Sequence, residues 1–434
     1  MNKTVAFLTL GCKVNLYDTE AMTELFSKRG YEIRDFEQKA DIYVINTCTV
    51  TNFGDKKSRQ MIRRARRKNP LAIIIATGCY AQVADSEVAA IDGINIVLGT
   101  ANRLNIVDIA ENYSPDEPVL NLVSDIKKEK IFEPMSVESM KDRTRAYMKI
   151  QDGCNRYCSY CIIPYARGPI RSRPLEDVVA EAKRLADNGF KEIVLTGIHI
   201  ASYGAETGNF SFIDAIEAVN NVEGIERIRF SSMEPKAITD EFIERVGRCE
   251  KVCDHYHLSL QSGCDKTLKE MNRRYSCEEY YEAVCKLRKA FPDVAVTTDV
   301  IAGFPGESDE DFAQTLDFLR KVHIDKIHAF PYSPKKGTPA AVRKDQVAPE
   351  VKAKRTEQLL RLSDILNEEF LLRFKGKEKA VLFENKSDGY WCGHTTNYIK
   401  VMVKTDENIN NLLKNTVLTS VYEPEIMLGE LKNG

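Results

Sequence analysis

The sequence predicts an α/β protein in three parts: an N-terminal parallel α/β sheet domain, a central partial (β/α)6 barrel and a small C-terminal antiparallel β-barrel. Three observations support this prediction. Short apolar strands alternate with amphipathic helices over residues 1–125, the same alternation resumes near residue 145, and residues 372–434 contain alternating strands without a helical period. The length of 434 residues also fits about three domains of ~150 residues each.

The first part, residues 1–125, repeats a strand, a turn and a helix. Alternation of this kind implies a parallel sheet covered by helices on both faces. The predicted strands are Val5–Leu10, Ile42–Asn46, Ala72–Ala76 and a shorter Ile94–Leu98. A charged, irregular stretch follows, and we interpret residues 126–143 as a linker.

The central part, residues 144–371, contains six strand–helix units, fewer than the eight of a complete barrel. Helices with apolar faces are expected at Leu175–Asn188, Asp309–Val322 and, at the end, Glu350–Phe374. The predicted strands are Ala146–Gln151, Ile193–Ile198, Arg227–Ser232, Tyr256–Gln261, Ala295–Ile301 and Lys326–Pro331. In the C-terminal part the predicted strands are Glu378–Glu384, Tyr398–Val403 and Val417–Tyr422, a pattern typical of small barrels that hold nucleic acid.

Composition excludes several classes of protein. The sequence has no apolar run of the ~18–20 residues that a membrane span needs, and its start resembles a strand rather than a signal peptide, so we expect a cytoplasmic protein without a membrane partner. Twelve cysteines are too few for a disulfide scaffold of this length. The net charge of −2 neither favours nor excludes a polyanionic partner.

Three cysteines, Cys12, Cys48 and Cys79, each follow the C-terminal end of a predicted parallel strand. Ligand sites in open α/β sheets lie outside these strand ends, so the three thiols are expected to converge although 36 and 31 residues separate them. Three thiolates near helix N-termini can hold an iron–sulfur cluster. Burial as small apolar side chains and zinc binding are the alternatives, but this half of the chain has no histidine to complete a zinc site.

Three further cysteines, Cys154, Cys158 and Cys161, are crowded into a C-x3-C-x2-C motif after the first central strand. Such a loop can bind three irons of a [4Fe–4S] cluster and leave the fourth iron open to the amino and carboxylate groups of a substrate. This spacing at the mouth of a β/α barrel resembles the radical S-adenosylmethionine (SAM) superfamily. The resemblance implies reductive cleavage of SAM to a 5′-deoxyadenosyl radical.

Other polar residues at the strand ends suit a SAM site. Each is as consistent with a tight turn as with a ligand contact. These candidates are Thr196, Gly197, Ser259, Gln261 and Gly303.

The whole chain resembles the methylthiotransferases, which combine an N-terminal cluster domain, a radical SAM domain and a C-terminal TRAM domain. The matching stretches are TLGCKVNLYDTE (9–20), INTCTVTNFGDKKSRQ (45–60), GCYAQ (78–82), KIQDGCNRYCSYCIIPYARG (149–168), RFSSMEP (229–235), HLSLQSG (257–263) and GFPGE (303–307). Within the family, NTCTVT with the following DKKSRQ, GCYAQ and LTGIHIASYG (195–204) resemble the MtaB branch. That branch is similar in activity to enzymes that methylthiolate C2 of N6-threonylcarbamoyladenosine at position 37 of tRNA.

The resemblance implies two [4Fe–4S] clusters, an auxiliary one at Cys12, Cys48 and Cys79 and one that binds SAM at Cys154, Cys158 and Cys161. It also implies two SAM molecules, one to methylate a sulfur at the auxiliary cluster and one to give the radical that removes hydrogen from C2. An external electron donor and a sulfur donor are then needed, and we expect a monomer. Both clusters must face one cavity, so the two domains should pack strand tip to strand tip.

A basic stripe from Lys56 to Lys68 has eight basic residues and no acid, on a predicted helix directly after Cys48. Local clustering of this kind is what phosphate binding needs, although a solvated helix face is the simpler alternative. The RNA-binding candidates in the stripe are Lys56, Lys57, Arg59, Arg63, Arg64 and Arg67. Those in the C-terminal barrel are Trp391 and Tyr398, whose rings can stack on bases, although core packing is expected for at least half of the aromatic side chains there.

Two other functions remain open from the sequence. One is methylthiolation by the sister branches of the family, which act on isopentenyladenosine in tRNA or on an aspartate of a ribosomal protein. The other is a non-catalytic iron–sulfur protein that binds RNA and uses its clusters only to order its domains. Arg167, Arg171 and Arg173 after the second cysteine motif can contact SAM, a substrate phosphate or only helix ends.

Overall fold

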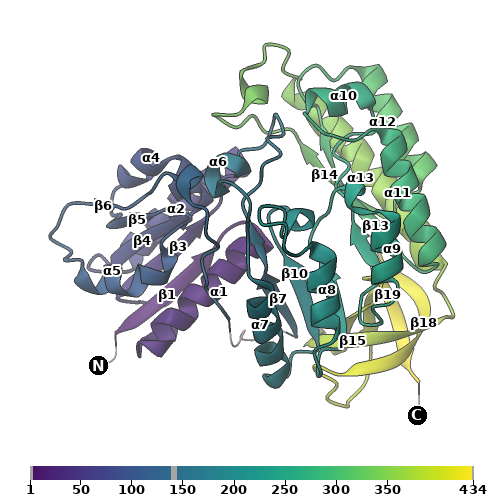
Figure 1. The fold of residues 1–434 in the computed structure, drawn as a ribbon, viewed down its shortest axis with the longest axis horizontal. Helices are drawn as coiled ribbons and strands as arrows, with labels where there is room; N and C mark the ends of the chain where they lie inside the picture. Colours follow the sequence, from purple (N-terminus) through teal and green to yellow (C-terminus); the bar gives the residue numbers. More distant parts are fainter. Residues whose placement is uncertain (1–2, 138–143, 433–434) are drawn as a thin grey trace.

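The first domain contains an all-parallel sheet of six strands in the order β2-β1-β3-β4-β5-β6. The computed structural model describes residues 3–137 and 144–432 (Figure 1). This confirms the predicted parallel sheet and adds two short edge strands. The strands are β1 (Thr4–Thr9), β2 (Glu32–Arg34), β3 (Ile42–Thr47), β4 (Ile73–Gly78), β5 (Ile96–Leu98) and β6 (Leu120–Asn121).

Helices cover both faces of this sheet because successive strand residues point to opposite sides. Val44 of β3 packs in the same core as Tyr17 of α1, whereas its neighbour Ile45 packs with Ile62 of α2 on the other face. The helices of this domain are α1 (Lys13–Lys28), α2 (Asn52–Lys68), α3 (Cys79–Val83), α4 (Asp85–Ala89) and α5 (Ile106–Asn112).

The segment that follows is irregular, as predicted, but it is packed against both domains. Phe132, Met135 and Val137 are buried, and Glu133 pairs with Arg103 at 2.9 Å. A single turn of 3-10 helix, Ile126–Lys128, is its regular part. The predicted linker also includes residues 138–143, which lie outside the described residues.

The central domain is a six-stranded open barrel built from two three-stranded parallel sheets, β7-β10-β11 and β12-β13-β14. Parallel bridges between Ile228 and Val252 and between Met233 and Leu258 join the two sheets. The predicted partial (β/α)6 barrel is therefore confirmed. Its strands are β7 (Arg145–Lys149), β10 (Glu192–Thr196), β11 (Arg227–Phe230), β12 (His255–His257), β13 (Ala295–Ala302) and β14 (Lys326–Pro331).

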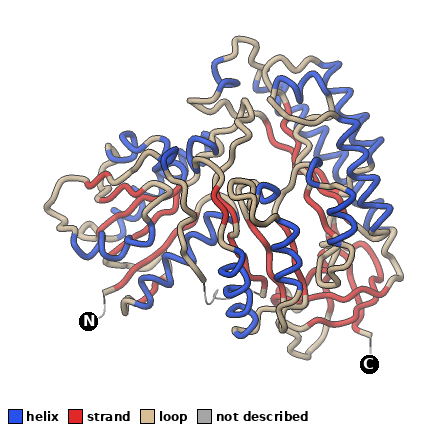
Figure 2. Tube along the Cα trace, viewed as in Figure 1, coloured by secondary structure: helices blue, strands red, loops and turns tan. Residues whose placement is uncertain are grey.

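Helices lie on the outer surface of this curved sheet (Figure 2). Several begin at a serine whose side chain and the acidic residue three positions later form a reciprocal capping box, as Ser276 and Glu279 do at α11. A short hairpin of β8 (Gln151–Asp152) and β9 (Arg171–Ser172) flanks the cysteine loop. The helices are α6 (Ile163–Arg167), α7 (Leu175–Asp187), α8 (Phe212–Asn220), α9 (Asp240–Val246), α10 (Asp265–Glu270), α11 (Cys277–Ala290), α12 (Asp309–Val322) and α13 (Pro349–Leu372).

The C-terminal domain is a closed five-stranded barrel in the order β15-β16-β17-β19-β18. The sequence predicted a purely antiparallel barrel, but β17 and β19 pair in parallel. The barrel packs against the central strands. There, Arg227 donates hydrogen bonds to the carbonyl oxygens of Ala380 at 2.7 Å and His394 at 2.8 Å. The strands are β15 (Glu378–Ser387), β16 (Tyr390–Thr395), β17 (Lys400–Val403), β18 (Leu413–Glu423) and β19 (Ile426–Leu431).

The three domains form one elongated molecule. Figure 1 shows the first domain (purple to blue) beside β7 and α7 of the central domain, and the C-terminal barrel (yellow) at the opposite end. Among residues 3–137 and 144–432, no helix combines the length and the apolar character needed to cross a bilayer.

Candidate functional site

Cys12, Cys48 and Cys79 lie at the ends of three neighbouring strands, as the sequence predicted. Cys12 caps the N-terminus of α1, and Cys79 is the first residue of α3. The loops of Cys12 and Cys48 lie so close together that a Cβ atom at Gly11 would be 3.0 Å from the Sγ atom of Cys48. The sheet therefore brings residues from three separate loops to one place.

Asn15 holds two of these loops together. Its side-chain amide donates hydrogen bonds to the carbonyl oxygens of Leu10 at 2.7 Å and Thr47 at 3.1 Å. Its Oδ1 atom lies 3.9 Å from the Sγ atom of Cys79. One buried amide thus contacts all three cysteine loops, a role that strand and helix patterns do not reveal.

The second group of cysteines lies on one loop after β8. The backbone N–H of Cys154 donates to the carbonyl oxygen of Gly168 at 3.0 Å, and that of Cys161 donates to Cys158 at 2.9 Å. Gly153 has φ +75°, and a Cβ atom there would lie 1.8 Å from the carbonyl oxygen of Pro169. The loop can close this tightly only because glycine precedes its first cysteine.

A cavity of about 570 Å³ joins the two groups. Cys12 of the first domain and Cys154, Cys158 and Cys161 of the central domain all line it, whereas Cys48 and Cys79 do not. The first domain therefore presents one of its three cysteines directly to the cavity of the second.

Four of the five predicted SAM contacts line the same cavity: Thr196, Gly197, Ser259 and Gln261. The hydroxyl of Thr196 is buried without a hydrogen-bond partner in the described part of the chain, which suits a bound ligand. Gln261 has φ +72°, a left-handed conformation that is costly for this residue type and is concentrated at functional sites.

Gly303 is not among the residues that line this cavity, and its role as a SAM contact stays a prediction. Its φ is +71°, its N–H donates to the carboxylate of Glu307 at 2.8 Å, and a Cβ atom would lie 2.5 Å from the Cγ atom of Lys352. Turn geometry and close packing against α13 explain this glycine.

Glu234 is a cavity residue that sequence reasoning missed, although it lies in the quoted RFSSMEP stretch. Its carboxylate is 3.0 Å from Arg156, 3.2 Å from His199 and 3.3 Å from Arg273. Burial alone would raise the pKa of Glu234, but the hydrogen bond from His199 and the nearby guanidinium groups lower it to about 2.

Arg273 carries this network to the cysteine loop, because its guanidinium also donates to the Sγ atom of Cys158 at 3.3 Å. A positive group at this distance stabilises a thiolate.

Buried ion pairs lock the first domain to the central one. Asp18 of α1 accepts from Arg103 at 2.5 Å, from Arg167 at 2.8 Å and from Lys149, and all four side chains are almost completely buried. Arg167 also lies 3.1 Å from Asp152. Buried charges of this kind persist only when they are paired, so the interface has one preferred arrangement.

Arg167 also reaches the first cysteine group. Its Nε atom donates to the Sγ atom of Cys79 at 3.3 Å, and it donates to the Oδ1 atom of Asn15 as well. Burial raises the pKa of Cys79 to about 11, and the positive charge of Arg167 opposes this rise. Among the roles open to the arginines after the second motif, Arg167 therefore contacts a cysteine of the other domain, while Arg173 pairs with Glu181.

Each group supplies three free cysteines, the ligand type that binds iron–sulfur clusters. Within residues 3–137 and 144–432, no group of three His, Cys, Asp or Glu residues is arranged to hold a single metal ion.

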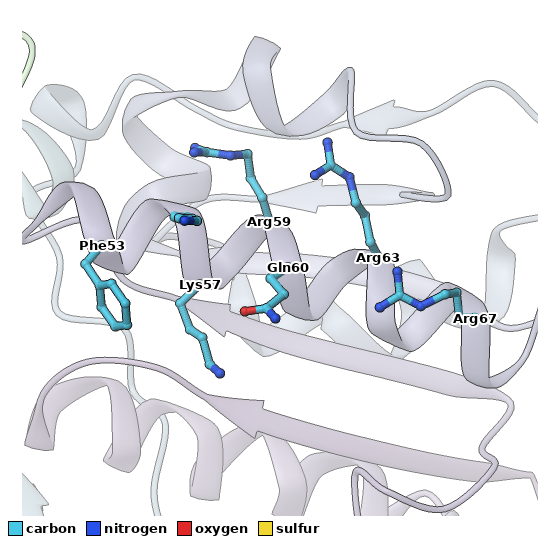
Figure 3. A pocket seen from close by; sticks show the side chains of 7 residues that line it. Phe53, Lys57, Arg59, Gln60, Arg63 and Arg67 are labelled. Carbon is cyan, nitrogen blue, oxygen red and sulfur yellow. The ribbon is translucent and has the colours of Figure 1, made fainter.

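The basic stripe forms α2, as predicted, with Thr51 as its N-cap. Figure 3 shows Phe53, Lys57 and Gln60 on one side of the helix and Arg59 and Arg63 extending to the other. Phe53 is 75% exposed. An exposed aromatic ring beside several cations is the combination that single-stranded RNA binds.

Not every basic side chain of α2 is free to bind a phosphate. Arg59 donates to the hydroxyl of Tyr80 at 2.9 Å, and Arg64 pairs with Glu37 at 2.5 Å. In the described ranges, Lys56, Lys57, Arg63 and Arg67 have no ion-pair partner.

Trp391 does not offer a free face for bases, so its predicted stacking role is wrong, whereas Tyr398 is 40% exposed and its RNA-binding role stays a prediction. Trp391 is only 8% exposed and packs in the barrel core, because the alternation of β16 directs it inward. Tyr398 is stacked between His255 and His394, with ring centroids 4.8 Å apart in both pairs.

The chain is similar to known proteins along most of its length. Residues 148–319 match the radical SAM superfamily, and residues 4–99 match a family described as uncharacterized protein family UPF0004. The radical SAM methyltransferase TsrM from Kitasatospora setae has a similar fold, with a TM-score of 0.57 and 15% identity over 79% of this chain and 77% of that one.

Two relatives extend along nearly the whole chain. The threonylcarbamoyladenosine tRNA methylthiotransferase MtaB of Bacillus subtilis (strain 168) is 46% identical, covering 96% of this chain and 94% of its own. A tRNA-2-methylthio-N(6)-dimethylallyladenosine synthase of Thermodesulfovibrio yellowstonii is 37% identical, covering 93% of each chain. The chain therefore belongs to the methylthiotransferase family of radical SAM enzymes, which work with a [4Fe–4S] cluster and SAM.

Proposed function

We propose that this enzyme methylthiolates C2 of N6-threonylcarbamoyladenosine at position 37 of tRNA. The observation that carries the proposal is the cavity shared by Cys12 and the loop of Cys154, Cys158 and Cys161. The relative with 46% identity bears the name of this activity, and the 37% relative bears that of the dimethylallyladenosine reaction.

The six cysteines divide into two ligand sets. Cys154, Cys158 and Cys161 hold the [4Fe–4S] cluster that binds SAM, and Cys12, Cys48 and Cys79 hold a second, auxiliary [4Fe–4S] cluster. Together the clusters and SAM supply one-electron chemistry that acts on an unactivated C–H bond, and sulfur for transfer. An external electron donor and a sulfur donor complete the reaction.

The residues of the chain position the reactants. SAM binds at the strand ends, surrounded by Thr196, Gly197, Ser259 and Gln261. The guanidinium group of Arg273 stabilises the thiolate form of Cys158. Asn15 and Arg167 fix the geometry of the first cysteine group. The buried ion pairs around Asp18 keep both groups at one cavity, so sulfur and the adenine carbon meet without diffusion.

The tRNA would lie across α2, with Lys56, Lys57, Arg63 and Arg67 on its phosphates. We assign residues 1–125 to the auxiliary-cluster domain, 126–143 to the linker, 144–371 to the radical SAM domain and 372–434 to the TRAM domain. The substrate tRNA places the enzyme in the cytoplasm.

Mass spectrometry of nucleosides tests the substrate assignment. The enzyme, reconstituted without oxygen and supplied with SAM, dithionite and sulfide, is incubated with tRNA that carries either modification at position 37. The expected product is 2-methylthio-N6-threonylcarbamoyladenosine. Product from the isopentenyladenosine tRNA alone would overturn the assignment, and absence of 5′-deoxyadenosine would support a non-catalytic protein.

A further inference from the structure

A second cavity, of about 310 Å³, lies inside the central barrel between the strand starts and the strand ends. All three domains contribute to it: Lys13 comes from α1 of the first, Arg229 and His257 from the central strands, and Tyr398 from the C-terminal barrel. The interior of a β/α barrel is normally filled with branched apolar side chains. A polar cavity at this position, at the low end of the ~300–1,000 Å³ typical of ligand sites, calls for an occupant.

This cavity adjoins the candidate active site. Lys13 and Ser232 line both the 310 Å³ cavity and the 570 Å³ cavity that the cysteines line. Lys13 directly follows Cys12 in the chain. A substrate group that reaches Lys13 therefore lies beside the cavity of Cys12.

The charges around the inner cavity are mostly neutralised within the protein. Arg145 pairs with Glu384 at 2.9 Å, Arg229 with Glu192 at 2.7 Å, and Lys326 with Glu425 at 2.5 Å. Asp299, the acidic side chain that lines the cavity, lies 3.2 Å from His257.

Lys13 is the exception. Over the described ranges it has no acidic side chain within ion-pair distance, and its charge lies among those of Arg145 and Arg229. Lys13 is an exposed residue, so water solvates its ammonium group in this structure. An anionic ligand group at the mouth of the cavity would replace that water and gain a charge-assisted partner.

We propose that the inner cavity binds the carboxylate of the threonylcarbamoyl group, with Lys13 as its ion-pair partner. The inference rests on the proposed function and adds a basis for substrate choice. The threonylcarbamoyl group ends in a carboxylate and a hydroxyl, whereas the dimethylallyl group is apolar and would leave Lys13 without a partner. An apolar group that covered Lys13 would remove its water without supplying a partner, and such a loss is a strong means of rejecting the wrong substrate.

The arrangement also orients the adenine ring. N6 and C2 are separated by only C6 and N1, so a substituent anchored at Lys13 keeps C2 near Cys12. The hydroxyl of Ser232 and the imidazole of His328 add hydrogen-bonding groups for the carbamoyl and hydroxyl parts of the substituent.

Binding of anticodon stem-loops tests this site without relying on turnover. Three RNAs are compared by fluorescence anisotropy on the holoenzyme: one with threonylcarbamoyladenosine at position 37, one with its carboxylate methyl ester, and one with unmodified adenosine. We expect the wild type to prefer the free acid by about tenfold or more. Lys13→Gln should lose this preference, and Lys13→Arg should keep most of it.

Lys57→Gln, a change to a half-buried cation on α2, is the matched control and should weaken binding of all three RNAs by the same factor. Iron content is measured for each variant, because Lys13 adjoins Cys12. The methyl ester comparison on the wild type needs no variant, so it decides the question even if Lys13→Gln folds poorly.

Equal binding of acid and ester by the wild type would overturn the proposal. So would a Lys13→Gln variant that keeps the preference, or one that weakens all three RNAs equally and thus marks Lys13 as a phosphate contact. If the wild type methylthiolates the threonylcarbamoyladenosine tRNA and any of these results is found, only the carboxylate site fails. If it modifies only isopentenyladenosine tRNA, the proposed function itself fails.

Discussion

The two cysteine groups are built in opposite ways. Cys154, Cys158 and Cys161 lie within eight residues on one loop, whereas Cys12, Cys48 and Cys79 come from three loops that the parallel sheet brings together. The first arrangement depends mainly on local backbone geometry. The second depends on the whole first domain and on contacts from the central domain, of which Arg167 at Cys79 is the clearest.

This difference separates the two groups experimentally. Changes far from the cysteines should disturb the auxiliary group while the loop of the central domain keeps its cluster. It also separates the roles proposed for them, which are SAM binding for the loop group and sulfur transfer for the dispersed group.

The largest effect is expected when either group is removed. Replacing Cys154, Cys158 and Cys161 with Ala should lower iron from about eight to about four atoms per chain and abolish 5′-deoxyadenosine formation. Replacing Cys12, Cys48 and Cys79 should lower iron equally but leave 5′-deoxyadenosine formation intact. Iron analysis and chromatography measure both, and loss of all iron from either variant would show that the groups are not independent.

The next largest effect is expected at the domain interface. Asp18→Asn removes the negative charge shared by Arg103, Lys149 and Arg167 and should destabilise the protein by about 3–5 kcal/mol, with loss of the auxiliary cluster before the other. Thermal unfolding and iron content check this.

Asp108→Asn is the control, because Asp108 pairs with Arg29 on the surface. We expect its melting temperature to stay close to that of the wild type. Equal losses in the two variants would mean that the buried network has no special role.

Gly78 tests the packing beneath the dispersed group. It has φ +93°, and a Cβ atom would lie 2.3 Å from the Oδ1 atom of Asn46 and 2.5 Å from the carbonyl oxygen of Thr47. Gly78→Ala should therefore cost about 2–4 kcal/mol and displace Cys79.

Gly189→Ala is a suitable comparison, since Gly189 has φ +84° but no atom within 4 Å of the added Cβ. It carries only the backbone penalty of about 1–2 kcal/mol. A Gly78→Ala protein as stable as Gly189→Ala, with full iron, would contradict the close packing described here.

The smallest effect is expected at α2, the helix of the first domain that is proposed to bind tRNA. Lys57→Gln together with Arg63→Gln should weaken tRNA binding and reduce the slope of log K against log salt by about 1.4–1.8, because two phosphate contacts are lost. Arg64→Gln should change the slope less, since Arg64 already pairs with Glu37. Identical slopes for the double variant and the wild type would exclude Lys57 and Arg63 as phosphate contacts.

Much of this molecule could be predicted from local patterns. The C-x3-C-x2-C spacing identified the loop group directly, and the strand-end positions of Cys12, Cys48 and Cys79 identified the dispersed group. Strand–helix alternation predicted both α/β domains, because burial on both faces makes the strands continuously apolar.

The remaining features depend on distant contacts. Arg167 and Asn15 are 152 residues apart, and no periodicity relates them. Arg273 and Cys158 are likewise 115 residues apart. Trp391 was assigned wrongly because a barrel strand has an inner and an outer face, and register alone decides which face an aromatic residue occupies.

The separate roles of the two cysteine groups are tested most directly by nucleoside mass spectrometry on the variant that lacks Cys12, Cys48 and Cys79. Reconstituted with SAM, reductant, sulfide and tRNA bearing threonylcarbamoyladenosine, this variant should form 5′-deoxyadenosine but no 2-methylthio product, while the wild type forms both. Formation of the methylthio nucleoside by the variant would contradict an auxiliary cluster at the strand ends of the first domain.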